Sequence, residues 1–185
     1  DRETGTPGPE TLGDSVYPGL GNGGYRVSGY DLDLAYDAGT RLVEASATLT
    51  VTATQELSRF SLDALGLDIH TVTVGGEPAA LEQGGEKLRT PPASTLSAGE
   101  TTTVVVAYGA DPRRTLAHTA WVPTPDGFAV CPQPNSAHTV FPCNDHPADK
   151  ADFTFRVTVP AGLRGVPSGG PVSAEELGDR RARPP

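Results

Sequence analysis

The sequence predicts an all-β domain in which several antiparallel strands form a two-sheet sandwich. Three observations lead to this fold class. Apolar and polar residues alternate in several separate segments, which is the period of a half-buried strand. Glycine and proline occur 22 and 18 times among 185 residues, so much of the chain is turn or extended structure. Helical periodicity is almost absent, and only residues 173–182 could form two helical turns.

The first predicted strands differ in their patterns. Residues 25–37 contain leucines that alternate with aspartates, as expected for a strand with one solvated face. Residues 44–55 alternate most regularly, and their threonine and valine content favours a strand. Residues 68–81 predict another strand followed by a hairpin turn, because Gly75 and Gly76 are typical of such turns.

Two further strands complete the predicted domain. Residues 101–111 contain three consecutive valines and predict a strand that is buried on both faces. Residues 151–162 alternate again and predict a strand that ends at Pro160, because proline cannot donate to a ladder.

Composition divides the chain into three parts. Residues 1–24 are rich in glycine, proline and polar side chains, which predicts a flexible lead-in. The strands lie within residues 25–165 and predict one β-sandwich domain. Residues 166–185 are rich in glycine, proline, arginine and glutamate, and we interpret them as a loop or a truncated tail.

Charge and hydropathy limit the possible partners. The net charge of −9 argues against a nucleic acid or an anionic membrane, because both require clustered Lys and Arg. No run of about 18 apolar residues is present, so no transmembrane helix is predicted. The polar start suits a mature secreted protein, and secretion is the expectation, although a trimmed N-terminus would look the same.

Residues 130–155 concentrate the side chains that could carry chemistry. Cys131 and Cys143 could form a disulfide in an oxidising compartment or remain reduced thiols, and the sequence leaves both alternatives open. His138 and His146, with an aspartate and a thiolate, offer nitrogen, oxygen and sulfur ligands for zinc.

A metal site is nevertheless disfavoured. Proline holds this backbone extended, and the adjacent side chains of Asp145 and His146 diverge. Histidines in turns and on the surface are the simpler interpretation. No G-x-S-x-G nucleophile motif occurs, and the glycines of residues 19–24 precede a strand, so we interpret them as a linker turn and not as a phosphate loop.

Residues 141–153 give the strongest functional indication. They resemble the segment P-C-x-D-x-P-x-x-K-A-x-F in the N-terminal β-domain of M1 zinc aminopeptidases. Residues 25–37 and 57–76 resemble strands of the same domain, so the resemblance covers about residues 25–165. The matching motif residues are Pro142, Cys143, Asp145, Pro147 and Lys150.

The resemblance implies a large, saddle-like β-domain that packs against a thermolysin-like catalytic domain of the same polypeptide. It also implies that one residue, ten positions before the motif cysteine, holds the free α-amine of a peptide substrate. Here that residue is Gln133. An amide oxygen accepts a hydrogen bond from an ammonium group, although more weakly than a carboxylate does. The structural alternative is that Gln133 caps nearby backbone groups.

The catalytic motifs of this family are missing from the chain. The sequence contains no H-E-x-x-H and no G-x-M-E-N segment, and it has no methionine at all. The transition-state tyrosine of the family is likewise missing. We therefore expect the catalytic domain and its Zn²⁺ to lie beyond residue 185, and we expect no catalytic residue and no metal ligand within this chain.

Three functional hypotheses follow. The chain is the N-terminal domain of an M1-type aminopeptidase, which removes N-terminal residues from peptides. Alternatively, it is a free-standing β-sandwich that binds a protein or a glycan. The third hypothesis places the domain in an epoxide-hydrolase-like branch of the same family.

Overall fold

The computed structural model describes residues 5–16, 18–116, 118–131, 136–145, 150–163 and 173–176, with the backbone alone for the last range. Within these residues the chain forms strands and one short 3₁₀ turn, η1 (Ala137–Thr139), so the all-β prediction is confirmed. No helix in this part of the chain is long and apolar enough to cross a membrane.

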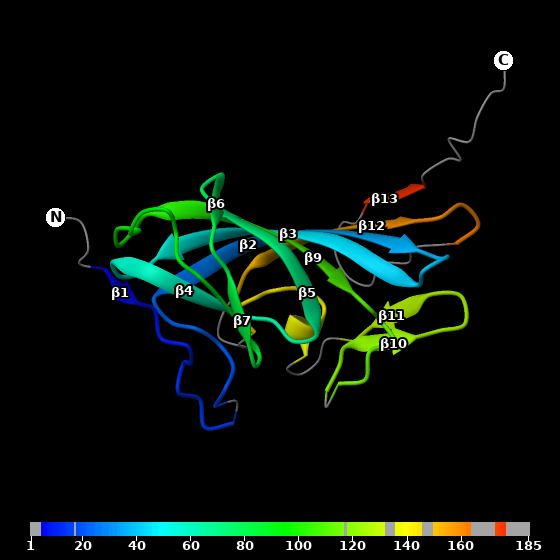
Figure 1. Cartoon of the computed structure of the whole chain (residues 1–185), viewed down its shortest axis with the longest axis horizontal. Coiled ribbons are helices and arrows are strands. Elements are labelled where there is room, and N and C mark those ends of the chain that lie inside the picture. The colour runs from blue at the N-terminus through cyan, green and yellow to red at the C-terminus, as the bar shows by residue number, and fades with distance from the viewer. Residues whose placement is uncertain are drawn as a thin grey trace, which may run out of the picture.

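The larger sheet has seven strands in the order β13-β12-β2-β3-β9-β5-β6 (Figure 1). The ladder from β2 through β3, β9 and β5 to β6 is antiparallel, as the sequence predicts. The strands are β2 (Tyr25–Asp37), β3 (Leu42–Ala53), β5 (Leu67–Val74), β6 (Glu77–Ala79), β9 (Thr101–Ala110), β12 (Asp152–Val159) and β13 (Ser173–Glu176).

The other edge of this sheet departs from the antiparallel prediction. Strand β12 lies parallel to β2, and β13 lies parallel to β12. The chain reaches β12 through a long crossover after β9, which is the connection that a parallel pair requires. The helical turns predicted for residues 173–182 are wrong at Ser173–Glu176, where pairing with β12 satisfies the backbone and a two-turn helix would be marginal.

A smaller sheet packs against the larger one. It has the order β1-β4-β8-β7, formed by β1 (Thr6–Pro7), β4 (Leu57–Asp63), β7 (Glu82–Gly84) and β8 (Lys87–Thr90). Phe60 of β4 contacts Tyr25 of β2 edge-to-face, with ring centroids 5.7 Å apart. Both sheets therefore share one apolar core, as expected for a sandwich.

The alternation of residues assigns the faces of the central strands. In β3, Ala47, Leu49 and Val51 are fully buried, and the threonines between them point away from the core. Strand β9 shows the same alternation over residues 104–107, because Val104 and Val106 are fully buried while Val105 and Ala107 are partly exposed. The prediction that this strand is buried on both faces is therefore wrong there, and it holds only at the end of the strand, where Tyr108, Gly109 and Ala110 are all buried.

The N-terminal residues are part of the domain. We call residues 5–24 the N-terminal strap; Tyr17 lies outside the described residues. The amide of Gly8 donates to the carbonyl of Arg59 (2.8 Å), and Leu20 is buried. The strap thus replaces the flexible lead-in that composition predicts. Most of the predicted tail at 166–185 lies outside the described residues.

A hairpin of β10 (Trp121–Pro123) and β11 (Phe128–Val130) forms a separate two-stranded unit. It lies at the opposite end of the view from β1 in Figure 1. Trp121 and Tyr36 of β2 both contact Phe128 edge-to-face, at 5.0 and 5.4 Å between ring centroids. These contacts place the hairpin against the end of the larger sheet.

Tyr108→Phe tests a link between the larger sheet and the segment after η1. The Tyr108 hydroxyl is buried and donates to the carbonyl of Val140 (2.8 Å). Removing it leaves that carbonyl without its donor, so the free energy of unfolding should fall by about 1 kcal/mol at pH 7, measured by urea unfolding. The control Tyr36→Phe removes a hydroxyl that makes no hydrogen bond within the described residues, and it should change less.

The same variant should alter the pH dependence of stability. Burial, and secondarily the charge of Cys143, raises the pKa of Tyr108 far above its usual value. Unfolded tyrosine ionises near pH 10, so this residue favours the folded state below about pH 10 and loses that contribution above it, by up to ~1.4 kcal/mol per pH unit. The wild type should therefore lose more stability than Tyr108→Phe between pH 9 and about pH 11. Equal losses would contradict the assignment.

Candidate functional site

The segment that carries the predicted site residue is defined here as the motif loop, residues 131–145. Residues 132–135 lie outside the described residues, and Gln133 is among them. Pro147 lies outside them as well. The structure shows how the described part of the loop is held.

Both ends of the motif loop are anchored to the domain. At its start the backbone N–H of Cys131 donates to the carbonyl of Ala120 (2.8 Å). At its end Cys143 and Asp63 form an antiparallel bridge, with backbone hydrogen bonds of 3.0 and 2.7 Å. The loop is therefore attached to the β10–β11 hairpin on one side and to the end of β4 on the other.

Thr139 connects the middle of the loop to the hairpin. Its carbonyl accepts a hydrogen bond from the indole Nε1 of Trp121 (2.6 Å). Its hydroxyl accepts from the amide of Ala120 (2.9 Å) and donates to the carbonyl of Ser136 (2.6 Å). All of these groups are buried, so each bond also prevents the cost of an unsatisfied polar group.

Asp145 of the motif holds the 3₁₀ turn from downstream. Its Oδ2 accepts from the backbone N–H of His138 (3.1 Å) and from the ring Nδ1–H of the same residue (2.6 Å). Nδ1 is the donor because a carboxylate can only accept. His138 is fully buried, and its Nε2 has no hydrogen-bond partner among the described residues. The orientation of the ring therefore depends on Asp145.

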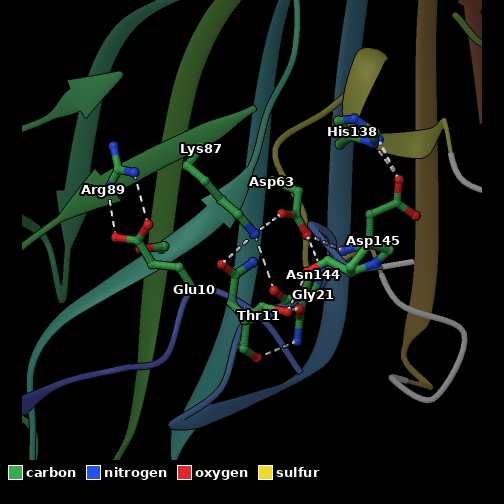
Figure 2. A network of polar contacts seen from close by, with 12 residues as sticks. Glu10, Thr11, Gly21, Asp63, Lys87, Arg89, His138, Asn144 and Asp145 are labelled. Carbon is green, nitrogen blue, oxygen red and sulfur yellow. Dashed lines mark hydrogen bonds and ion pairs between the residues drawn. The ribbon is translucent and has the colours of Figure 1, made fainter. Parts of the chain in front are cut away.

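Asp63 lies at the centre of a buried polar network (Figure 2). Its side chain is fully buried, and Oδ1 accepts from the ammonium of Lys87 at 2.5 Å. Its Oδ2 accepts from the amides of Gly21 and Asp145, both at 3.0 Å. Lys87 also donates to the carbonyl of Gly21 (3.2 Å) and to Oδ1 of Asn22 (3.0 Å), so its three protons all have acceptors.

Asn144 adds a second connection between the strap and the motif loop. Its Oδ1 accepts from the amide of Asn22 (2.7 Å), and its Nδ2 donates to the carbonyl of the same residue (3.3 Å). Its own amide donates to the hydroxyl of Tyr30 (3.0 Å). We call the connected group the polar core; it consists of Gly21, Asn22, Asp63, Lys87, Asn144 and Asp145.

The motif residues differ in their exposure to solvent. Pro142 and Cys143 are buried, Asp145 is partly buried, and Lys150 is exposed. The disulfide that the sequence left open is not formed: both cysteines are free thiols, Cys131 exposed and Cys143 buried. The backbone of Cys143 is paired with Asp63 inside the domain, whereas Cys131 follows the hairpin at the surface.

The described residues do not bring together a donor set for zinc. Among the described residues, no three side chains of His, Cys, Asp or Glu lie close enough together to hold a metal ion. Two of the zinc ligands that the sequence offers, His138 and Asp145, do lie together, but they form a hydrogen bond with each other. His146 lies outside the described residues.

Sequence reasoning missed the strap side of the polar core. The glycines at 19–24 are not a linker: Gly21 has φ +76°, which glycine adopts without strain, and its amide faces Asp63. At Gly24, a Cβ would lie 2.5 Å from Leu57. One signal was available, because Asp63 stands alone among apolar residues, and a charged residue in such a run requires a partner.

Arg41 supports the hairpin from which the motif loop starts. It is the one non-glycine residue with positive φ (+61°) in the described part of the chain. Its Nη2 donates to the carbonyls of Thr124 and Pro125, at 2.9 and 3.0 Å. The turn between β2 and β3 thereby contacts the turn between β10 and β11.

The fold and this loop define a β-domain with an anchored loop, and no three His, Cys, Asp or Glu side chains of its described residues are grouped to hold a metal ion. The chain belongs to the peptidase M1 N-terminal domain family, whose match spans residues 27–182.

Solved structures agree with the family. An M1 zinc metallopeptidase from Deinococcus radiodurans is 34% identical and superposes with a TM-score of 0.73. A mutant of an M1 zinc metallopeptidase from the same organism, bound to a Tyr-Ser-Ala substrate, gives the same values. A two-domain M1 zinc metallopeptidase mutant bound to L-arginine is 33% identical, also with a TM-score of 0.73. Each match covers 82% of this chain and 36% of the other, so the chain spans about a third of their length.

Asp63→Asn should strongly destabilise the domain. The amide would leave the Lys87 ammonium buried without a counter-charge and would offer fewer acceptor sites to the two amides at Oδ2. Removing one partner of a buried ion pair costs about 3–5 kcal/mol, measurable by urea unfolding. Arg156→Gln, which breaks the exposed pairs with Asp31 and Asp33, is the control and should change stability much less. Equal effects would refute the central role of Asp63.

Arg41→Gly should loosen the β10–β11 hairpin with little effect on global stability. Glycine relieves the positive φ but loses two hydrogen bonds, so the net change should stay within ~1 kcal/mol. Amide hydrogen exchange at Val122 and Ala129 should become faster. Arg41→Lys retains a cation at the same place and should show a smaller increase. Unchanged exchange in both variants would exclude this contact as a support.

Proposed function

We propose that this chain is the substrate-wall domain of an M1-type zinc aminopeptidase and that Gln133 accepts a hydrogen bond from the substrate's free α-amine. The parent enzyme would remove N-terminal residues from peptides. The observation that carries the proposal is the anchored motif loop: a loop that must present one side chain to a substrate benefits from a support that cannot shift. Secretion remains a prediction from composition.

The contacts of the loop suit this role. The segment 132–135 lies between Cys131, anchored to Ala120, and Ser136, anchored through Thr139. Four residues, 132–135, separate these two anchored positions in the sequence. Positioning of this kind lowers the entropy cost of binding a substrate group.

The partner of this wall would be the catalytic domain of the same polypeptide. The chain contains no H-E-x-x-H segment, and its described residues offer no zinc ligand set. The zinc and the groups that cleave the peptide bond would therefore come from that domain. The match to two-domain metallopeptidases that are much longer than this chain favours this arrangement over a free-standing binding module.

Gln133→Ala in the full-length protein should lower kcat/KM for an amino-acid anilide. The hydrogen bond to the ammonium is worth about 1.5–3 kcal/mol in a desolvated site, which corresponds to roughly a 10- to 100-fold loss. Gln133→Glu should retain or raise kcat/KM, because a carboxylate is the stronger acceptor. Steady-state kinetics over a substrate series measures both.

Gln83→Ala, on the exposed strand β7, is the matched control and should leave kcat/KM unchanged. Full activity of Gln133→Ala would refute the role of this residue. The present chain alone should show no peptidase turnover. Chelator-sensitive turnover by the chain alone would refute the proposal that the zinc and the catalytic groups come from the other domain.

A further inference from the structure

The N-terminal strap contributes directly to the support of the motif loop. The family match begins at residue 27, so the strap at 5–24 lies outside it. Nevertheless two strap residues, Gly21 and Asn22, belong to the polar core and are buried. Gly21 is labelled beside Asp63 in Figure 2. An arrangement of this kind connects a segment outside the family's domain to a loop inside it.

The side chains of Asp63 and Asn144 link the strap to the motif loop. One oxygen of Asp63, Oδ2, accepts from the strap at Gly21 and from the motif loop at Asp145, both at 3.0 Å. The side chain of Asn144 accepts from and donates to the backbone of Asn22. Asn144 is therefore bonded directly to Asn22, whereas Asp145 is linked to Gly21 through Asp63. Movement of the strap would leave buried polar groups unsatisfied on both sides.

The connection continues into the loop. The amide of Asp145 donates to Asp63. The carboxylate of Asp145 accepts hydrogen bonds from the backbone N–H and from the ring Nδ1–H of His138. The carbonyl of His138 in turn accepts from the amide of Leu65, just after β4 (2.9 Å). His138 is fully buried, so its ring can change orientation only if Asp145 moves.

A separate attachment holds the outer part of the strap. Glu10 forms two hydrogen bonds with the guanidinium of Arg89, at 2.6 and 2.8 Å. This pair is not among the members of the polar core. Cutting it weakens the strap without touching the loop, and it therefore supplies a control.

We propose that Asn22 and Asn144 are positioning residues: through them the N-terminal strap fixes Asp145 and His138, and thereby the loop that presents the substrate-binding side chain. The effect on substrate rests on the proposed function, whereas the coupling between strap and loop does not. The role differs from general stabilisation because it is local to residues 136–145.

Hydrogen exchange tests the coupling by itself. In Asn144→Ala, and independently in Asn22→Ala, the amides of His138 and Asp145 should exchange about 10-fold faster relative to the amide of Val106 in the centre of the larger sheet. Glu10→Gln should leave this ratio within about 2-fold of the wild type. Unchanged ratios in both asparagine variants overturn the inference, whatever the function of the chain. If one variant fails to fold, the other decides.

Ligand affinity in the full-length protein tests the consequence. The probes are leucine hydroxamate and its desamino analogue, 4-methylpentanoic hydroxamate, which differ only in the α-amine. In Asn144→Ala, the ratio of the two affinities should fall by about 10-fold, while the affinity of the desamino probe should stay within about 2-fold of the wild type. In Glu10→Gln, both affinities should be unchanged. The fall of the ratio in Gln133→Ala is the reference with which the effect of Asn144→Ala is compared.

The outcomes separate the two proposals. If Gln133→Ala lowers the ratio and neither asparagine variant does, the positioning role is overturned and the proposed function stands. If Gln133→Ala leaves the ratio unchanged, the proposed function fails, and the substrate part of this inference fails with it. In that case the exchange measurements still decide whether the strap and the loop are coupled.

Discussion

The carboxylate of Asp63 is the group on which the arrangement of three chain segments depends. It is completely buried, and it receives hydrogen bonds from Lys87, from Gly21 in the strap and from Asp145 in the motif loop. A buried charge is costly unless every lone pair and proton has a partner. The three segments must therefore meet in one geometry, since no partial arrangement satisfies the charge.

The P-C-x-D motif acquires a physical explanation from these contacts. Cys143 pairs its backbone with Asp63, which places the next two residues beside the polar core. Asp145 then uses its amide toward Asp63 and its carboxylate toward His138. The motif is thus a support in which Pro142 and Cys143 are buried and Asp145 is partly buried, whereas Lys150 is exposed.

Local sequence pattern predicted strands β2, β3, β5, β9 and β12, but it missed most of the short strands, including the β10–β11 hairpin, and it did not predict long-range relations. The alternation in β2 and β3 was sufficient because one face of each strand is buried and the other is not. The parallel placement of β12 beside β2 depends on the path of a long crossover, which periodicity does not record. The polar core was missed for the same reason: Asp63 bonds to residues 42 positions before it and 82 after it. Composition was misleading in the strap, where glycines serve close contact and not flexibility.

Gln133 was reached through family resemblance alone, since nothing in its local sequence distinguishes it from a loop amide. The two carboxylates of the described support have partners within the domain, Asp63 with Lys87 and Asp145 with the His138 ring. Under the role proposed for Gln133, a change from Gln to Glu would therefore add a charge at the proposed site without removing either of these pairs.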